Sequence, residues 1–141
     1  MVLYEGLFFT EEEVDLIHSL EKTTLTREND KLHCTFKYRP QKEEIFNNII
    51  DKEFAVYLTG YANDGQNNGF QISLPKELEN YYINYDEELN KLKIPHITAS
   101  LSKGAKAVNT KNLEFIPLEK PIKIVGKFGL RIKEKKNNWK A

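Results

Sequence analysis

Cysteine occurs only once in this 141-residue sequence, as Cys34. A single cysteine excludes an internal disulfide and a cysteine-based zinc cage, and it fits a reducing compartment. Basic and acidic residues number 21 each, so the chain has no overall basic excess that would hold a long polyanion by counterion release. The balanced charge favours a small or short nucleotide ligand over a long nucleic-acid duplex.

Long apolar runs are missing as well. No stretch approaches the ~20 apolar residues of a membrane-spanning helix. Met1–Glu5 lacks the positive and apolar segments that open a signal peptide. We therefore expect a cytoplasmic protein with no membrane partner, and nothing in the sequence points to an obligate protein partner.

The residues that are present suit one folded domain. Hydrophobic residues make up 40% of the chain and charged residues 30%, and the aromatic side chains can fill a core. A chain of this length buries about two thirds of its unfolded surface around one core. We expect a single domain over residues 1–141 that needs no cofactor to fold.

Hydrophobic periodicity predicts strands and short helices in alternation. In the first half we expect a strand over Val2–Phe9, a helix from Glu11 to about Leu20 with a Thr10–Glu13 capping box, a loop over Thr23–Asp30, a strand over Lys31–Tyr38 and a short helix over 43–51. In the second half we expect a hairpin of Phe54–Ala62 and Phe70–Leu74, a helix after Pro75 and a strand over Ile94–Ser102. Near the end we expect Pro121–Val125 and Lys127–Lys133 to form a hairpin or a bulged strand about Gly126. Residues Glu134–Ala141 should form a loose tail.

Two of the three histidines stand two residues before a threonine, each inside a predicted strand. Residues i and i+2 of a strand share a face, so each motif presents an imidazole beside a hydroxyl. The same alternation places Lys37 on the face of His33 and Thr35, opposite Cys34, Phe36 and Tyr38. It places Ser100 and Ser102 on the face of His96 and Thr98.

Two imidazoles and two hydroxyls around one point suit cleavage of a phosphodiester without a metal. A neutral histidine removes a proton from water, and a protonated histidine supplies one to the leaving ribose oxygen. With an ordinary pKa near 6.5, histidine exists in both states at neutral pH. One His-x-Thr triplet is weak support, because such triplets occur by chance, but two copies in separate halves favour the catalytic interpretation.

The segments His33-Cys34-Thr35-Phe36 and His96-Ile97-Thr98-Ala99-Ser100-Leu101 resemble the paired His-x-Thr/Ser-hydrophobic motifs of the 2H phosphoesterase superfamily. The order of elements is similar over nearly the whole chain, and the compact form resembles the tRNA-ligase-like and phage-encoded cyclic phosphodiesterase branches. The resemblance implies an α+β, bilobal, LigT-like fold, with antiparallel sheets related by pseudo-twofold symmetry around a central cleft. With 62 residues between the two histidines, the spacing is shorter than in many members.

The same resemblance implies an enzyme that hydrolyses a small cyclic nucleotide, a cyclic oligonucleotide or a 2′,3′-cyclic phosphate at an RNA end. It assigns His33 and His96 as acid and base and Thr35 and Thr98 as phosphate ligands, with no metal or other cofactor. The biological setting would be RNA repair or, in a phage protein acting in the host cytoplasm, evasion of cyclic-nucleotide defence.

Four further residues are candidate substrate contacts: Tyr4, Lys37, Tyr61 and Ser100. The tyrosines can stack on a base, and the other two share predicted strand faces with the motifs. Two alternatives stay open. The first is a non-catalytic nucleotide- or RNA-binding module of the same fold, and the second is a metal site that uses His33 and His96, which no neighbouring ligand pattern supports.

Overall fold

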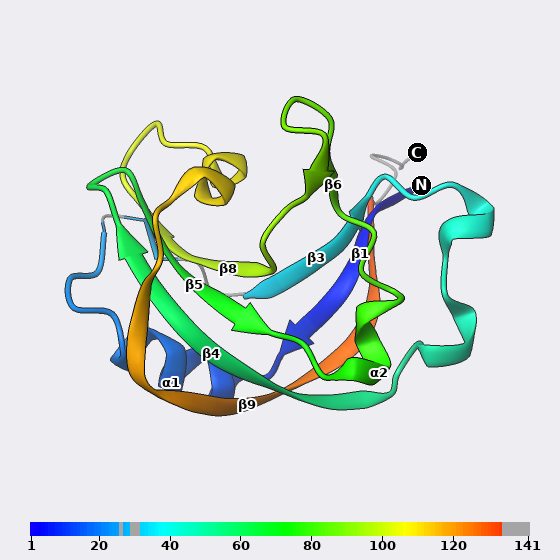
Figure 1. The fold of residues 1–141 in the computed structure, drawn as a ribbon, viewed down its shortest axis with the longest axis horizontal. Coiled ribbons are helices and arrows are strands. Elements are labelled where there is room, and N and C mark those ends of the chain that lie inside the picture. Colours follow the sequence, from blue (N-terminus) through cyan, green and yellow to red (C-terminus); the bar gives the residue numbers. More distant parts are fainter. Residues whose placement is uncertain (26, 29–31, 134–141) are drawn as a thin grey trace, which may run out of the picture.

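One curved sheet of mostly antiparallel strands dominates the fold (Figure 1). The structure is a computed structural model that describes residues 1–25, 27–28 and 32–133. The strand order in the main sheet is β2-β8-β5-β4-β9-β1-β3. Its strands are β1 (Val2–Phe9), β2 (Arg27–Glu28), β3 (His33–Tyr38), β4 (Glu53–Asn63), β5 (Asn67–Ser73), β8 (His96–Leu101) and β9 (Ile116–Ile132). Two short strands, β6 (Tyr85–Asp86) and β7 (Lys91–Leu92), pair separately.

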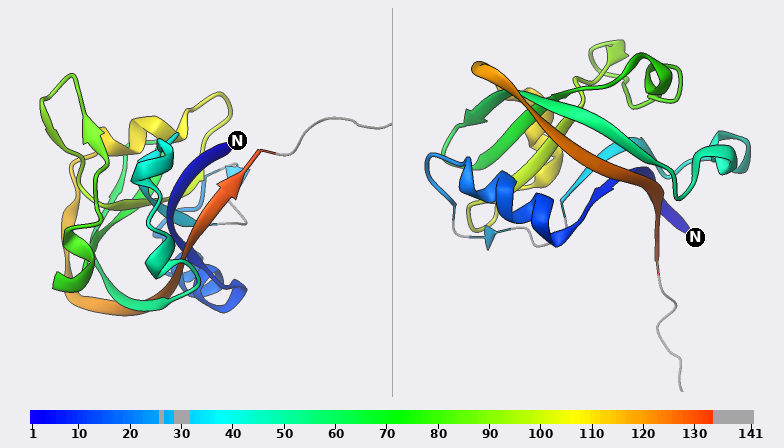
Figure 2. Two further views of the ribbon diagram at one scale, coloured as in Figure 1. Left: turned by 90° about the vertical axis from the view of Figure 1, so that its right-hand side faces the viewer. Right: turned by 90° about the horizontal axis from the view of Figure 1, so that it is seen from below.

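The sheet curls into a nearly closed barrel, as Figure 2 shows. At one edge β3 contacts β8, which lies next to the other edge. Because β3 and β8 carry the two motifs, this contact brings the two motif strands together directly. The enclosed core includes fully buried side chains from both halves of the chain, among them Leu7, Phe36, Leu58, Phe70, Ile97 and Phe128.

Two α-helices flank the sheet, α1 (Glu11–Ser19) and α2 (Lys76–Glu79). One half of the predicted capping box of α1 is confirmed: Thr10 Oγ1 accepts a hydrogen bond from the Glu13 backbone N–H at 3.4 Å. Pro75 occupies the N-cap of α2, so the predicted helix start is also confirmed. No helix within the described ranges is both long and apolar enough to cross a membrane.

The helix expected over 43–51 is wrong. Two 3-10 helices replace it, η1 (Lys42–Glu44) and η2 (Asn47–Ile49). Between them the Phe46 N–H donates to the Glu5 carboxylate at 3.2 Å instead of to a carbonyl one turn earlier, which interrupts the helical pattern. A further 3-10 helix, η3 (Ala107–Asn112), follows β8.

The strand predictions need two other corrections. The expected Thr23–Asp30 loop contains β2, which pairs with β8. Of the two arrangements expected about Gly126, the hairpin is wrong, because β9 is one strand that pairs with both β1 and β4. The bulge is not found there either, since the register with both neighbours is regular at Gly126. Gly126 packs under Phe9, where a Cβ would lie 2.9 Å from the ring. The predicted tail at 134–141 and Lys31 lie outside the described residues.

If the short strands β2, β6 and β7 and the 3-10 helices are left aside, the order strand-helix-strand-strand occurs twice, as β1-α1-β3-β4 and again as β5-α2-β8-β9. In the first set Gly6 pairs with Thr35, and in the second Gly69 pairs with Thr98. Each residue of the second pair stands 63 positions after its counterpart in the first. The two motif strands are therefore held by equivalent strand pairings.

Candidate active site

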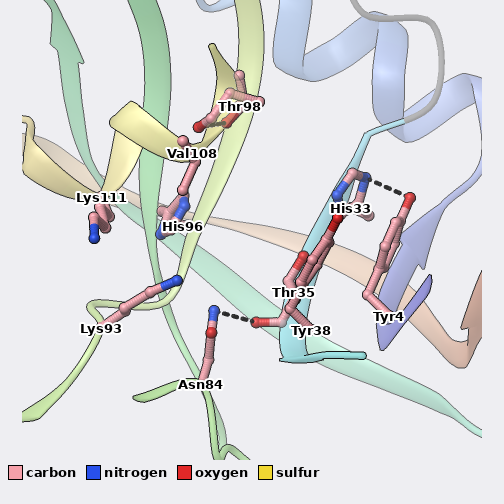
Figure 3. A pocket seen from close by; sticks show the side chains of 11 residues that line it. Tyr4, His33, Thr35, Tyr38, Asn84, Lys93, His96, Thr98, Val108 and Lys111 are labelled. Carbon is pink, nitrogen blue, oxygen red and sulfur yellow. Dashed lines mark hydrogen bonds between the residues drawn. The ribbon is translucent and has the colours of Figure 1, made fainter. Parts of the chain in front are cut away.

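A pocket of about 510 Å³ brings the two motifs together (Figure 3). His33 and Thr35 of β3 face it from one side, and His96 and Thr98 of β8 face it from the other. The remaining lining residues are Tyr4, Tyr38, Asn84, Lys93, Ala107, Val108 and Lys111. Both motif segments are strands, as the alternation predicts, and their histidines and threonines share one concave surface.

A β-bulge follows the threonine in each motif. In β3 Thr35 pairs with Gly6 and Lys37 pairs with Glu5, so Phe36 has no partner in the register. An extra residue of this kind bends a strand and turns the following side chains to the opposite face. The bend brings the β3 backbone close to Gly6 of β1, where a Cβ would lie 2.0 Å from the Cys34 carbonyl oxygen.

The bulge in β8 is its counterpart. Thr98 pairs with Gly69 and Ser100 pairs with Asn68, which leaves Ala99 unpaired. A Cβ on Gly69 would lie 2.7 Å from the Ile97 carbonyl oxygen. Because only glycine permits this approach, the two glycines set the angle at which each His-x-Thr motif enters the pocket.

These bulges overturn the predicted faces of Lys37 and Ser100. Each residue lies just after an unpaired residue, so simple alternation fails at that point and neither side chain lines the pocket. Lys37 forms an ion pair with Glu44 at 3.8 Å. Ser100 is fully buried and donates to Glu21 Oε1 at 2.6 Å.

The bulge in β3 brings Tyr38 into the pocket, although strand alternation places it on the opposite face. Its side chain is 56% exposed, so a large part of the ring remains available to a ligand. Tyr4, a predicted contact, does line the pocket. Its ring stacks on His33 with centroids 4.4 Å apart, and its hydroxyl lies 3.4 Å from His33 Nδ1.

Tyr61, the other tyrosine that the sequence suggested as a contact, lies in the core. It is 9% exposed and packs against Phe70 with ring centroids 4.9 Å apart. The adjacent Asn/Asp/Gly turn made Tyr61 look accessible, but its position on a central strand, β4, points it inward.

The His96 ring is oriented by its own strand. Its Nδ1 lies 2.7 Å from the Ile94 carbonyl oxygen, which can only accept, so Nδ1 carries a proton. In the neutral ring the lone pair is then on Nε2. Burial lowers the pKa of His96 below its usual range, the Ile94 hydrogen bond opposes that shift, and the Lys93 charge adds to it. The neutral ring is therefore favoured at pH 7.

Thr98 is supported by a second threonine. Its hydroxyl oxygen lies 2.7 Å from that of Thr110, which is buried and accepts a hydrogen bond from Asn67 Nδ2 at 2.9 Å. The Thr98 hydroxyl donates to Thr110 Oγ1, so Thr110 orients it toward its position in the pocket. A ligand oxygen that accepts from Thr98 would take this proton in place of Thr110.

Positive charge collects in this pocket although the whole chain is neutral. Lys93 and Lys111 line it, and its lining contains no carboxylate. Asp86 pairs with Lys111 at 3.2 Å but is not itself part of the lining. A low-dielectric cleft with cations and hydroxyl donors is suited to an anionic ligand.

Sequence reasoning missed Tyr38, Asn84, Lys93 and Lys111. Asn84 and Lys93 lie in the irregular region around the β6–β7 hairpin, and Lys111 lies in a 3-10 helix, so no periodic pattern marks them. Asn84 Nδ2 donates to the Thr35 carbonyl oxygen at 3.2 Å and so supports the first motif (Figure 3).

Within the ranges that the structure describes, no three histidine, cysteine or acidic side chains form a group able to hold a metal ion. Comparison with known proteins adds no assignment, since neither a family model nor a curated protein sequence matches this chain.

Proposed function

We propose that this chain is a metal-independent phosphodiesterase of the 2H type, with a bilobal fold of two related halves around the cleft. Its substrate would be a cyclic nucleotide, a cyclic oligonucleotide or a 2′,3′-cyclic phosphate at an RNA end. One observation carries the proposal: two His-x-Thr motifs, on strands with equivalent bulges, face one pocket that is rich in positive charge.

The geometry at His96 favours it as the general base. With Nδ1 committed to the Ile94 carbonyl, the Nε2 lone pair of the neutral ring can take a proton from water. The water oxygen then bonds to phosphorus while the bond from phosphorus to the leaving ribose oxygen breaks. His33, in its protonated state, donates the proton that the leaving oxygen needs. The product is a phosphomonoester with a free hydroxyl.

The two threonine hydroxyls stabilise the negative charge on the phosphoryl oxygens. Thr35 and Thr98 donate to the non-bridging oxygens, which gain negative charge in the transition state. Tyr4 stacks on His33 and holds its ring toward the pocket. Each positioned proton transfer contributes roughly 10²–10⁴ in rate, and the fixed donors add to it.

The decisive experiment is incubation of the purified protein with 2′,3′-cyclic nucleotides, cyclic di- and trinucleotides and RNA ending in a cyclic phosphate. Product mass and phosphate position identify the bond that breaks. Cleavage of RNA ends would favour RNA repair, and cleavage of cyclic oligonucleotides would favour evasion of cyclic-nucleotide defence. Binding without any turnover would instead identify the chain as a nucleotide-binding module.

The same assay in excess chelator tests the absence of a metal. Because side chains supply the acid, the base and the phosphate ligands, turnover should be unchanged after exhaustive chelation. A loss of turnover that a divalent ion restores would contradict the two-histidine mechanism. His33→Ala and His96→Ala, prepared in parallel, show whether any turnover observed belongs to this pocket.

A further inference from the structure

The two walls of the pocket differ in chemistry: one is aromatic and the other is positively charged. On the β3 side stand the rings of Tyr4 and Tyr38 beside His33. On the β8 side stand Lys93 and Lys111 beside His96, as Figure 3 shows. The strand pairings that hold the motifs are equivalent, but the charge around them is not. A ligand that fills the pocket therefore meets aromatic surface at one side and two cations at the other.

An ion pair with Asp86 holds the Lys111 side chain in position. Its ammonium group lies 3.2 Å from Asp86 Oδ2, and the two side chains are only 17% and 5% exposed. The other Asp86 oxygen accepts hydrogen bonds from the backbone N–H groups of Glu88 and Leu89, which fixes the carboxylate. Lys111 is therefore a cation pre-positioned by Asp86, the last residue of β6.

Lys93 has a different environment. Its backbone N–H donates to the Asn84 carbonyl oxygen at 2.8 Å, which anchors the residue at the pocket. Among the residues that the structure describes, its side chain has no ion-pair partner. Burial lowers the pKa of Lys93, the nearby Lys111 charge lowers it further, and Asp86 acts in the opposite direction. A half-buried cation beside a second cation is stabilised when an anion binds between them.

One phosphodiester does not account for this charge. The motifs already supply two imidazoles and two hydroxyls to the phosphate that is cleaved, and a phosphodiester carries a single negative charge. The protonated histidine that the mechanism requires balances that charge. Since Asp86 offsets Lys111, one positive charge on the β8 wall remains for another anion.

We propose that Lys93 and Lys111 form a second phosphate subsite beside His96, which binds a phosphate other than the one cleaved. This inference rests on the proposed function and narrows its substrate class. The substrate then carries at least two phosphates, such as a cyclic dinucleotide or a nucleoside 2′,3′-cyclic phosphate that also bears a 5′-phosphate. A nucleoside 2′,3′-cyclic phosphate without a second phosphate leaves the subsite empty and is a poor substrate.

The kinetic test compares three substrates with one base: adenosine 2′,3′-cyclic phosphate, the same compound with a 5′-phosphate, and cyclic diadenylate. We expect kcat/KM at least ~10-fold higher for one or both two-phosphate compounds, the size of effect that a charge-assisted contact produces. The two compounds distinguish a terminal phosphate from one within a ring. Assays at pH 8 keep His96 neutral in every variant, because Lys93 affects its pKa.

Lys93→Gln should remove most of that preference, because kcat/KM should fall much further for the two-phosphate compounds than for the single-phosphate compound. Lys111→Gln should act in the same direction. The exposed Lys123, on β9 outside the pocket, provides the matched control, and Lys123→Gln should change neither value. Equal losses on all three substrates in Lys93→Gln would overturn the subsite and assign Lys93 to the cleaved phosphate. A parent enzyme without any preference would overturn it too.

Binding of product-like ligands separates this inference from the proposed function. We expect adenosine 3′,5′-bisphosphate to bind at least ~10-fold more tightly than adenosine 5′-monophosphate by calorimetry, and Lys93→Gln to remove the difference. If that preference appears without turnover of any substrate, the proposed hydrolysis fails and the subsite stands. Turnover with equal affinity for the two ligands would leave the hydrolase and refute the subsite.

Discussion

His96 donates a hydrogen bond from Nδ1 to the Ile94 carbonyl oxygen at 2.7 Å, two residues earlier on the same chain. This contact selects one tautomer, and burial lowers the pKa of the ring. Both effects prepare Nε2 to accept a proton near neutral pH. The contact also distinguishes the two motifs, because His33 Nδ1 meets the Tyr4 hydroxyl instead.

The first prediction concerns the pH dependence of turnover. The rate should rise with pH through the pKa of a base that titrates below 6.5, and it should fall at higher pH as the acid loses its proton. The two apparent pKa values belong to the coupled pair. A pH–rate profile for kcat/KM measures both limbs, and a profile with no fall at high pH would contradict a histidine acid.

The second prediction concerns the histidines themselves. His33→Ala and His96→Ala should each reduce turnover at least ~10²-fold, the range of a positioned acid or base. The double variant should lose much less than the product of the two single losses, since groups that act as one unit are not additive. If His33→Ala stayed within a few fold of the parent while His96→Ala was inactive, another proton donor would have to be sought.

The third prediction concerns the threonines. Thr35→Ala and Thr98→Ala should cost about 1–3 kcal/mol of transition-state stabilisation, the range for a lost hydrogen bond in a buried site. Thr110→Val should reproduce part of the Thr98 effect, because Thr110 positions that hydroxyl at 2.7 Å. Kinetics of the three variants test this, with unfolding curves as the control for folding. A Thr110→Val enzyme with unchanged kcat would show that Thr98 needs no support.

The fourth prediction concerns the glycines opposite the threonines. An added methyl at Gly6 or Gly69 would meet a backbone carbonyl oxygen at 2.0 or 2.7 Å. Overpacking of this kind costs about 1–3 kcal/mol in stability, and the shift it forces should also displace the adjacent motif. We therefore expect Gly6→Ala and Gly69→Ala to lower both the thermal midpoint and kcat.

Gly129 supplies the matched control for these variants. It pairs with Gly6 from β9, but its added Cβ would come no closer than 3.6 Å to the Phe8 ring, an ordinary contact. Gly129→Ala should therefore keep parental activity. Full activity of Gly69→Ala would show that the close approach of Gly69 to the Ile97 carbonyl oxygen does not determine the position of His96 and Thr98.

The fifth prediction concerns Glu5, a fully buried carboxyl on β1. Its pKa is raised to about 7: burial is the main cause, the hydrogen bond from Phe46 opposes the shift, and the charge of Glu44 adds to it. The folded state thus binds a proton that the unfolded chain releases near pH 4.3. The contribution of Glu5 to the free energy of unfolding should fall as pH rises from about 4.3 to about 7 and then stay level.

Glu5→Gln should flatten that part of the pH–stability curve and raise stability at pH 8. The counterpart of Glu5 in the second half is Asn68, also fully buried, so an amide suits this position. Urea unfolding at several pH values measures the effect, with the exposed Glu119→Gln as control. An unchanged slope in Glu5→Gln would assign the titration to another group.

The sequence alone determined those features that depend on neighbours a few residues apart. The Thr10 cap acts on an N–H three residues later, and the alternation within each His-x-Thr motif extends over two residues. Both can be derived from local geometry, because a strand places side chains i and i+2 on one face whatever it pairs with. The two motif strands, the β4–β5 hairpin and both helix starts were predictable for this reason.

The tertiary structure decided everything that depends on a partner distant in the chain. Alternation failed at Phe36 and Ala99, where each strand bulges against a glycine on its neighbour, and so the faces of Lys37 and Ser100 were reversed. Gly126 does not end a strand, because β9 continues past it between β1 and β4. Lys93 and Lys111 reach the pocket from irregular segments that are positioned by Asn84 and Asp86. No short-range pattern encodes such contacts, because they exist only after the sheet has curled and brought β3 and β8 together.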